Sequence, residues 1–146
     1  MLAGNGMSAL PSVSAASFSH ALAEFETAWQ NPTYTRFTLP AVHVNGVLAN
    51  KYSSSVPVKI TRDMVWDMEL QKAWDPLTFI PYVVSEGKSW GRRKLQDGSE
   101  HFFRSSEQLG WIAKGRGTVL EEVFIDHAGQ RILFLGRESM ETTAET

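Results

Sequence analysis

The sequence predicts an α+β fold in which a curved antiparallel sheet wraps around helices and encloses a central apolar cavity, in a helix-grip-like or cone-shaped arrangement. Two segments in the first half space their apolar residues as amphipathic helices do. The second half has short apolar runs separated by Gly-containing turns, which is typical of antiparallel strands. Aromatic residues make up 11% of the chain and include five tryptophans, enough to line a cavity as well as to fill a core.

The first helix is expected over residues 17–30. Its apolar residues recur at spacings of four, three and four, which places them on one helical face: Phe18, Leu22, Phe25 and Trp29. Ser17 or Ser19 can cap its start. Asn31-Pro32 ends it, because proline disfavours helical geometry at the preceding residue. The apolar face must dock on another element.

A second helix is expected from Thr61 to the residue before Asp75-Pro76, after a short strand at 56–60. Thr61 can accept a hydrogen bond from a free backbone N–H, and Asp63 lies favourably at the positive helix end. Its apolar residues lie on two sides, with Met64, Val65 and Met68 towards one and Trp66, Leu70, Ala73 and Trp74 towards the other. Such a helix is covered on two sides, or is broken around one large buried group. Either arrangement suits a lid over a cavity.

The remaining elements are expected to be strands. Their predicted ranges are 34–39, 41–44, 79–84, 89–95, 100–106, 109–113, 118–125 and 131–135. Turns are expected at Asn45-Gly46, Glu86-Gly87, Asp97-Gly98 and residues 126–130, the last with Gly129 as the left-handed residue. In that turn, Asp126 should bond the backbone and His127 should be solvated. One domain, 16–140, is predicted between flexible tails at 1–15 and 141–146.

Composition excludes several classes of function. A net charge of -2 gives no basic field for nucleic acid. Without cysteine there are no disulfides and no thiolate sites, and the four histidines lack metal-ligand spacing, so neither a metal nor another cofactor is expected. No apolar run has the length of about 20 residues that a membrane span needs. The start lacks the pattern of a signal peptide, which predicts a cytoplasmic protein.

His101 and Glu122 are the candidate catalytic residues. Strand alternation puts His101 and Phe103 on one face and Phe102 and Arg104 on the other. If the face of His101 is the inner one, its imidazole lies among aromatic rings and becomes a usable base. If the face of Arg104 is the inner one, the guanidinium needs an acidic partner or a carboxylate ligand. A plain structural role is favoured for both.

Glu121 and Glu122 are adjacent on a strand and point to opposite faces, so they cannot form a carboxylate dyad. One of them must lie among inward apolar residues, and a charge on an edge strand is the favoured interpretation. Ligand binding is assigned to the aromatic residues and one arginine, because tryptophan and tyrosine combine apolar bulk with a polar handle: Trp66, Trp74, Phe79, Tyr82, Trp90, Phe103, Arg104 and Trp111.

The run from 56 to 84 resembles the START-like, Bet v 1-like (SRPBCC) superfamily, and within it the AtaL-like group. The residues that carry the resemblance are Val58, Ile60, Thr61, Val65, Trp66, Lys72, Ala73, Pro76, Phe79, Ile80 and Pro81, extended by Phe103-Arg104, 121–123 and 131–134. It spans about 47–138 and implies a helix-grip fold around a hydrophobic ligand cavity. That superfamily closes its cavity with a long C-terminal helix, which nothing after Arg137 can form, so the helix at 17–30 is expected to substitute.

Three functions follow as hypotheses. The first is a protein that binds a small apolar or aromatic molecule, as a cyclase-like or accessory protein of secondary metabolism. The second is an isomerase, dehydratase or cyclase resembling nuclear transport factor 2, with His101 as base and Glu122 or Asp67 orienting it. The third is a protein–protein adaptor that docks through the helix at 17–30. The chain is expected to be a monomer or a homodimer.

Overall fold

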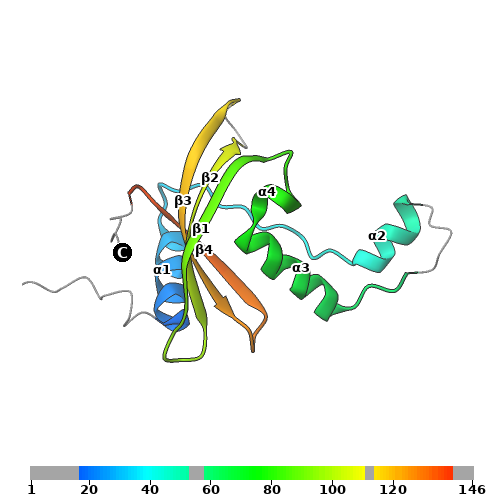
Figure 1. The fold of residues 1–146 in the computed structure, drawn as a ribbon, viewed down its shortest axis with the longest axis horizontal. Helices are drawn as coiled ribbons and strands as arrows, with labels where there is room; N and C mark the ends of the chain where they lie inside the picture. Colours follow the sequence, from blue (N-terminus) through cyan, green and yellow to red (C-terminus); the bar gives the residue numbers. More distant parts are fainter. Residues whose placement is uncertain (1–16, 53–57, 111–113, 140–146) are drawn as a thin grey trace, which may run out of the picture.

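Four helices and one antiparallel sheet make up the fold in a computed structural model, which describes residues 17–52, 58–110 and 114–139. The helices are α1 (Phe18–Gln30), α2 (Val44–Lys51), α3 (Arg62–Trp74) and α4 (Pro76–Phe79), and the strands are β1 (Val84–Lys94), β2 (Glu100–Leu109), β3 (Arg116–Asp126) and β4 (Arg131–Arg137). The strands lie in the order β1-β2-β3-β4 and do not close into a barrel (Figure 1). The predicted tails 1–15 and 141–146, and Trp111, lie outside the described residues.

The two faces of the sheet are covered by different helices. On one face, the start of α1 packs against β3 and β4 and forms a core of Phe18, Ala21, Leu95, Phe124 and Leu135. On the other, α3 contributes to a core of Ala73, Phe102, Val123 and Ile125, with three of its larger side chains packed against it. Figure 1 shows these helices on opposite sides of the sheet. The α+β class is confirmed, whereas an enclosed central cavity stays a prediction.

Helix α1 begins and ends where its capping signals lie. The Ser17 hydroxyl accepts a hydrogen bond from the His20 N–H at 3.1 Å, and the Asn31 N–H bonds the Ala28 carbonyl as the helix stops. Only the first turns of the predicted apolar face are buried, however. Phe25 and Trp29 instead stack on each other, with ring centroids 6.1 Å apart.

Helix α3 also has its predicted cap, since the Thr61 hydroxyl accepts from the Met64 N–H at 3.2 Å. Its two apolar sides differ in environment. The side with Trp66, Leu70 and Trp74 packs on the sheet, whereas Met64 and Met68 are exposed. Val65, the third residue of that side, is half-buried, but no described residue covers Met64 and Met68, so the expectation of a helix buried on two sides is wrong.

The segment between α1 and α3 differs most from the sequence prediction. Residues 35–43 are extended but pair with no strand, and the expected turn at Asn45-Gly46 is the first turn of α2. The Asn45 side chain bonds both the N–H and the carbonyl of Ile60 at 2.8 Å, and so fixes α2 to the chain before α3 rather than closing a hairpin. The expected strand at 56–60 is likewise not formed over its described residues, 58–60.

The part of this segment that forms α2 lies away from the sheet in Figure 1. Six of the segment's large apolar side chains are between 56% and 73% exposed: Tyr34, Phe37, Leu39, Val42, Tyr52 and Val58. Isolated exposed apolar residues are normal in proteins. Here they are concentrated in one extended segment.

Strand β1 replaces two predicted strands. Residues 76–79 form α4, whose start is capped by Asp75 at the Thr78 N–H, so the strand predicted at 79–84 is wrong. The expected turn at Glu86-Gly87 is wrong as well, because both residues pair with β2. The strand bulges instead between Trp90 and Arg93, where three steps along β1 oppose two along β2.

Gly91 makes this bulge possible. Its φ is 68°, and a Cβ atom there would lie 3.1 Å from the Phe103 ring. Gly91→Ala is therefore expected to lower the free energy of unfolding by about 1–2 kcal/mol, measured by urea denaturation. Gly136→Ala is the matched control, since it lies in β4 with no heavy atom within 4 Å of its added Cβ and should change stability little. Equal effects of the two substitutions would contradict this account.

The hairpin of β3 and β4 forms as predicted, with two differences in its turn. Gln130, rather than Gly129, has the left-handed φ, of 49°. Gly129 matters for a different reason, because a Cβ atom there would force the Asp126 carboxylate to shift. Asp126 accepts from the Gly129 N–H as expected, while His127 bonds Glu100. No helix among the described residues is long and apolar enough to cross a membrane.

Candidate functional site

The residues predicted to form one site are divided between the two faces of the sheet. Trp66, Trp74 and Arg104 lie on the α3 face, with Phe79 on the adjoining α4. His101, Glu122, Trp90 and Phe103 are joined by contacts on the α1 face. Tyr82 is 89% exposed in the turn before β1. A single pocket lined by all of them is therefore not formed.

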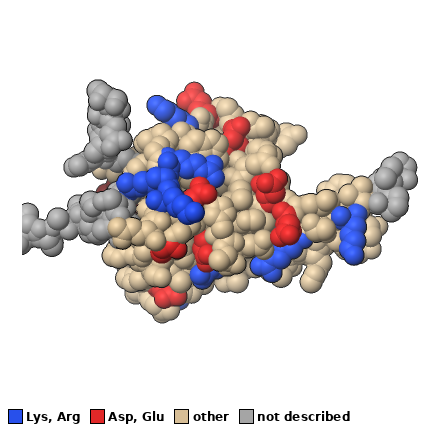
Figure 2. Space-filling view, turned by 60° about the horizontal axis from the view of Figure 1, so that its bottom comes forward, with Lys and Arg blue, Asp and Glu red and all other residues tan. Residues whose placement is uncertain are grey.

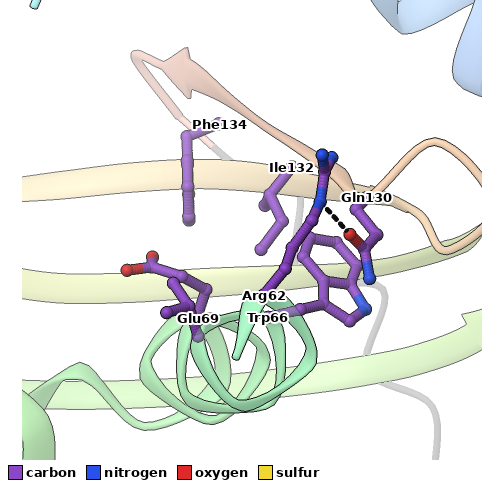
Figure 3. A pocket seen from close by; sticks show the side chains of 7 residues that line it. Arg62, Trp66, Glu69, Gln130, Ile132 and Phe134 are labelled. Carbon is purple, nitrogen blue, oxygen red and sulfur yellow. Dashed lines mark hydrogen bonds between the residues drawn. The ribbon is translucent and has the colours of Figure 1, made fainter. Parts of the chain in front are cut away.

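An open groove lies between α3 and β4 (Figure 3). We call it the α3–β4 groove; its volume is about 340 Å³ and its lining residues are Arg62, Val65, Trp66, Glu69, Gln130, Ile132 and Phe134. Its sides are mainly apolar. Ile132 and Phe134 face it from β4 because alternate residues of a strand share a face, and the indole of Trp66 faces it from α3.

Polar groups stand at the ends of the α3–β4 groove. At one end the Arg62 Nε donates to the Gln130 side-chain oxygen, the bond drawn in Figure 3, and the Gln130 amide donates to Asp63 at 3.1 Å. Glu69, towards the other end, is held by Lys72 at 2.6 Å. The volume is at the lower end of the range of small-molecule pockets. Apolar sides with polar ends suit a small, mainly apolar molecule.

Of the residues that line the α3–β4 groove, sequence reasoning assigned only Trp66 to a site. The alternation of Ile132 and Phe134 was a usable signal, because it gives β4 one apolar face. Gln130 could not be found in this way. It meets Arg62 across 68 positions of sequence, and the contact depends on how the hairpin turn lies against α3.

All three nitrogens of the Arg104 guanidinium have hydrogen-bond partners within the protein. Its Nε and Nη2 donate to the Glu121 carboxylate at 2.9 and 2.6 Å, and its Nη1 donates to the Ala73 carbonyl at 2.9 Å. Its guanidinium also lies 4.6 Å from the centre of the Phe134 ring. The pair joins β2 and β3 to the end of α3. The acidic partner that a buried guanidinium needs is thus present, and Arg104 has a structural role.

His101 and Glu122 are brought together on the α1 face, as the sequence hypothesis required. The His101 Nε2 lies 3.1 Å from the Glu122 carboxylate. Glu122 also accepts from the Arg137 Nε at 2.7 Å, and Arg137 continues to Glu24 on α1. Glu121 and Glu122 do point to opposite faces, but the edge-strand interpretation is wrong, because β3 is an inner strand.

Aromatic rings enclose the His101 imidazole. Its centroid lies 4.8 Å from that of Phe103 and 4.6 Å from that of Phe124, and Trp90 stacks on Phe103. The residue is 0% exposed. The acid–base pair is assembled, but a substrate reaches it only if this face opens.

Hydrogen bonds from His101, and then from Arg137, hold the pKa of Glu122 below its ordinary value of 4.5, against the effect of burial. Since the folded-state pKa is the lower one, this carboxylate stabilises the fold above about pH 4.5, and the contribution is lost as the pH falls through the folded-state pKa. We expect Glu122→Gln to lower the unfolding free energy at pH 7 and to flatten its decline in acid. Urea denaturation at pH 7, 5, 4 and 3 tests this. An unchanged acid decline would contradict it.

The charged side chains of the described residues are distributed over the surface as follows. Among the described residues, no three His, Asp or Glu side chains group as they would around a metal ion. On the face shown in Figure 2, one group of neighbouring basic side chains lies around an acidic one, and other acidic and basic groups are scattered over a largely uncharged surface.

Comparison with known proteins finds no matching family model, no matching curated protein and no matching solved structure. The resemblance of residues 47–138 to the START-like superfamily therefore stays a prediction from the sequence.

Proposed function

We propose that this chain binds a small apolar or aromatic molecule in the α3–β4 groove. The observation that carries the proposal is the groove itself, in which the Trp66 indole, Ile132 and Phe134 provide apolar surface open to solvent. An aromatic ligand would pack against these side chains, and burial of its apolar surface would drive binding.

The polar ends of the groove would give such a ligand an orientation. Arg62 has N–H groups beyond the one that bonds Gln130, and the Gln130 amide is already oriented by Asp63. A hydroxyl or carbonyl on the ligand would be held at this end. Under the proposed relation to the START-like superfamily, the groove would take the place of its ligand cavity, and a cyclase-like or accessory role in secondary metabolism would follow. A monomeric or homodimeric state and a cytoplasmic location belong to the same proposal.

An enzyme of the isomerase, dehydratase or cyclase type is the second candidate. The 3.1 Å contact between His101 and Glu122 favours it, because a carboxylate that orients an imidazole is the usual support of a general base. The complete burial of His101 argues against it in this conformation. If His101→Ala turned over an accepted substrate as fast as the unmodified chain does, this candidate would be excluded.

A pair of substitutions on α3 tests the binding proposal. Val65 lines the groove, so Val65→Trp should fill it and weaken the affinity for the neutral dye N-phenyl-1-naphthylamine at least about tenfold. Met64→Trp adds the same bulk at an exposed neighbour outside the groove and should leave the affinity within about twofold. Dye fluorescence gives both constants. Equal affinities of the two variants would refute the proposal.

A further inference from the structure

A second cluster, on the α1 face, has polar groups without partners. The Arg93 Nε and Nη2 and the His101 Nδ1 are buried and have no hydrogen-bond partner in the structure. The two residues face each other across β1 and β2, because Arg93 is paired with His101 in the strand register. Three buried nitrogens without partners thus belong to one cross-strand pair. Buried polar groups are nearly always hydrogen-bonded, and the two guanidinium nitrogens can only donate, so the arrangement calls for an acceptor at Arg93.

The pairing of the strand arginines with carboxylates also points to Arg93. Four other arginines of the described strands have a carboxylate partner: Arg92 with Glu100, Arg104 with Glu121, Arg131 with Asp126, and Arg137 with Glu122 and Glu24. Arg116 is exposed and donates to the Val83 carbonyl. Arg93 therefore carries a cation of which two nitrogens, Nε and Nη2, are buried without an anion, which is unfavourable unless one is bound.

The bulge of β1 creates this arrangement. One extra residue between Trp90 and Arg93 puts the side chain of Arg93 on the face of His101, while Arg92 lies over Trp74 and Phe102 on the α3 face. The stacked rings of Trp90 and Phe103 occupy the next cross-strand position on the α1 face. Bulges commonly redirect side chains next to functional sites.

The unpartnered atoms fit a carboxylate. The Nε and one Nη of an arginine form a planar fork that matches the two oxygens of a carboxylate. Because the His101 Nε2 is committed to Glu122, the His101 Nδ1 is the remaining polar atom of this pair without a partner. The flanking indole and phenyl rings suit an organic acid with an aromatic or apolar body.

We propose that Arg93, which is partly exposed beside the buried His101, forms a carboxylate-binding site, separate from the α3–β4 groove and on the opposite face of the sheet. The carboxylate comes from a free organic acid or from the chain itself. Outside the described residues, the sequence has only two acidic side chains, Glu141 and Glu145. The proposal does not depend on ligand binding in the groove.

Titration of the full chain with phenylacetate, followed by NMR of the arginine Nε–H groups and by calorimetry, tests the proposal. Phenylacetate should bind saturably and shift the Arg93 resonance, and phenylacetamide, its neutral analogue, should bind at least about tenfold more weakly. Arg93→Met should abolish binding, and Arg93→Lys, which keeps the charge but lacks the fork, should weaken it. Arg92→Met, next along β1 but on the other face, is the matched control and should leave it unchanged.

A double variant, Glu141→Gln with Glu145→Gln, identifies the source of the carboxylate. If phenylacetate binds this variant but not the unmodified chain, the site exists and is filled by the C-terminal segment. If it binds both equally, the site takes a free acid. If phenylacetate binds neither chain, the proposal is overturned. It is also overturned if Arg93→Met and Arg93→Lys leave the affinity for phenylacetate unchanged, or if phenylacetamide binds as tightly as phenylacetate.

Discussion

Glu121→Gln is expected to lower the free energy of unfolding by about 3–5 kcal/mol, because it leaves the buried guanidinium of Arg104 without its counter-ion. Arg104 directs two N–H groups at this carboxylate and a third at the Ala73 carbonyl. Both side chains of the pair are largely shielded from water. The substitution therefore weakens the attachment of α3 to the sheet as well as an ion pair. Urea denaturation followed by circular dichroism measures the change.

Two further variants show whether the effect comes from the unpaired charge. Glu69→Gln breaks the more exposed pair with Lys72 and should cost less than about 1 kcal/mol. The double variant Arg104→Met with Glu121→Met removes both charges and should recover much of the stability lost in Glu121→Gln. A loss below about 1 kcal/mol in Glu121→Gln would show that Arg104 is not buried against this carboxylate.

Phe102→Ala is expected to cost about 3–5 kcal/mol, the usual loss for removing a fully buried phenyl ring. Phe102 is 0% exposed in the core between α3 and the sheet, and its ring meets the Trp74 indole edge-on at 5.0 Å between centroids. A cavity there would border both the sheet and the last turn of α3. Thermal and urea unfolding both report the loss.

Phe37→Ala is the control for this substitution. Phe37 is 66% exposed in the connection between α1 and α2, and its removal should change stability little. If Phe102→Ala were as mild as Phe37→Ala, the α3 face would not be a core, and the account of a sheet covered on both faces would be wrong.

The elements that the sequence predicts well are those with local signals. Ser17 and Thr61 cap α1 and α3 by bonding N–H groups three residues away, so the sequence alone contains both partners of each bond. The hairpin of β3 and β4 is also local. In contrast, α2 depends on Asn45 bonding Ile60 fifteen residues later, and a short window that reads Asn45-Gly46 as a turn cannot contain that information.

Alternation separated His101 and Phe103 from Phe102 and Arg104, but could not say which face was inner. Both faces are buried, because α1 packs on one and α3 on the other, and these contacts join segments far apart in the sequence. The contact of His101 with Glu122 also joins two strands, and the sequence hypothesis named both residues. Arg93 was not named, because only the bulge at Gly91 places it beside His101.

The central claim is that the α3–β4 groove binds a small apolar molecule through Trp66. The most direct test is NMR of the indole N–H groups of the tryptophans during titration with N-phenyl-1-naphthylamine, with the Trp66 resonance assigned through Trp66→Phe. We expect the Trp66 signal to shift saturably at one dye per chain while that of Trp90, on the opposite face, stays in place. A Trp66 signal that does not move, or a larger saturable shift at Trp90, would contradict the account.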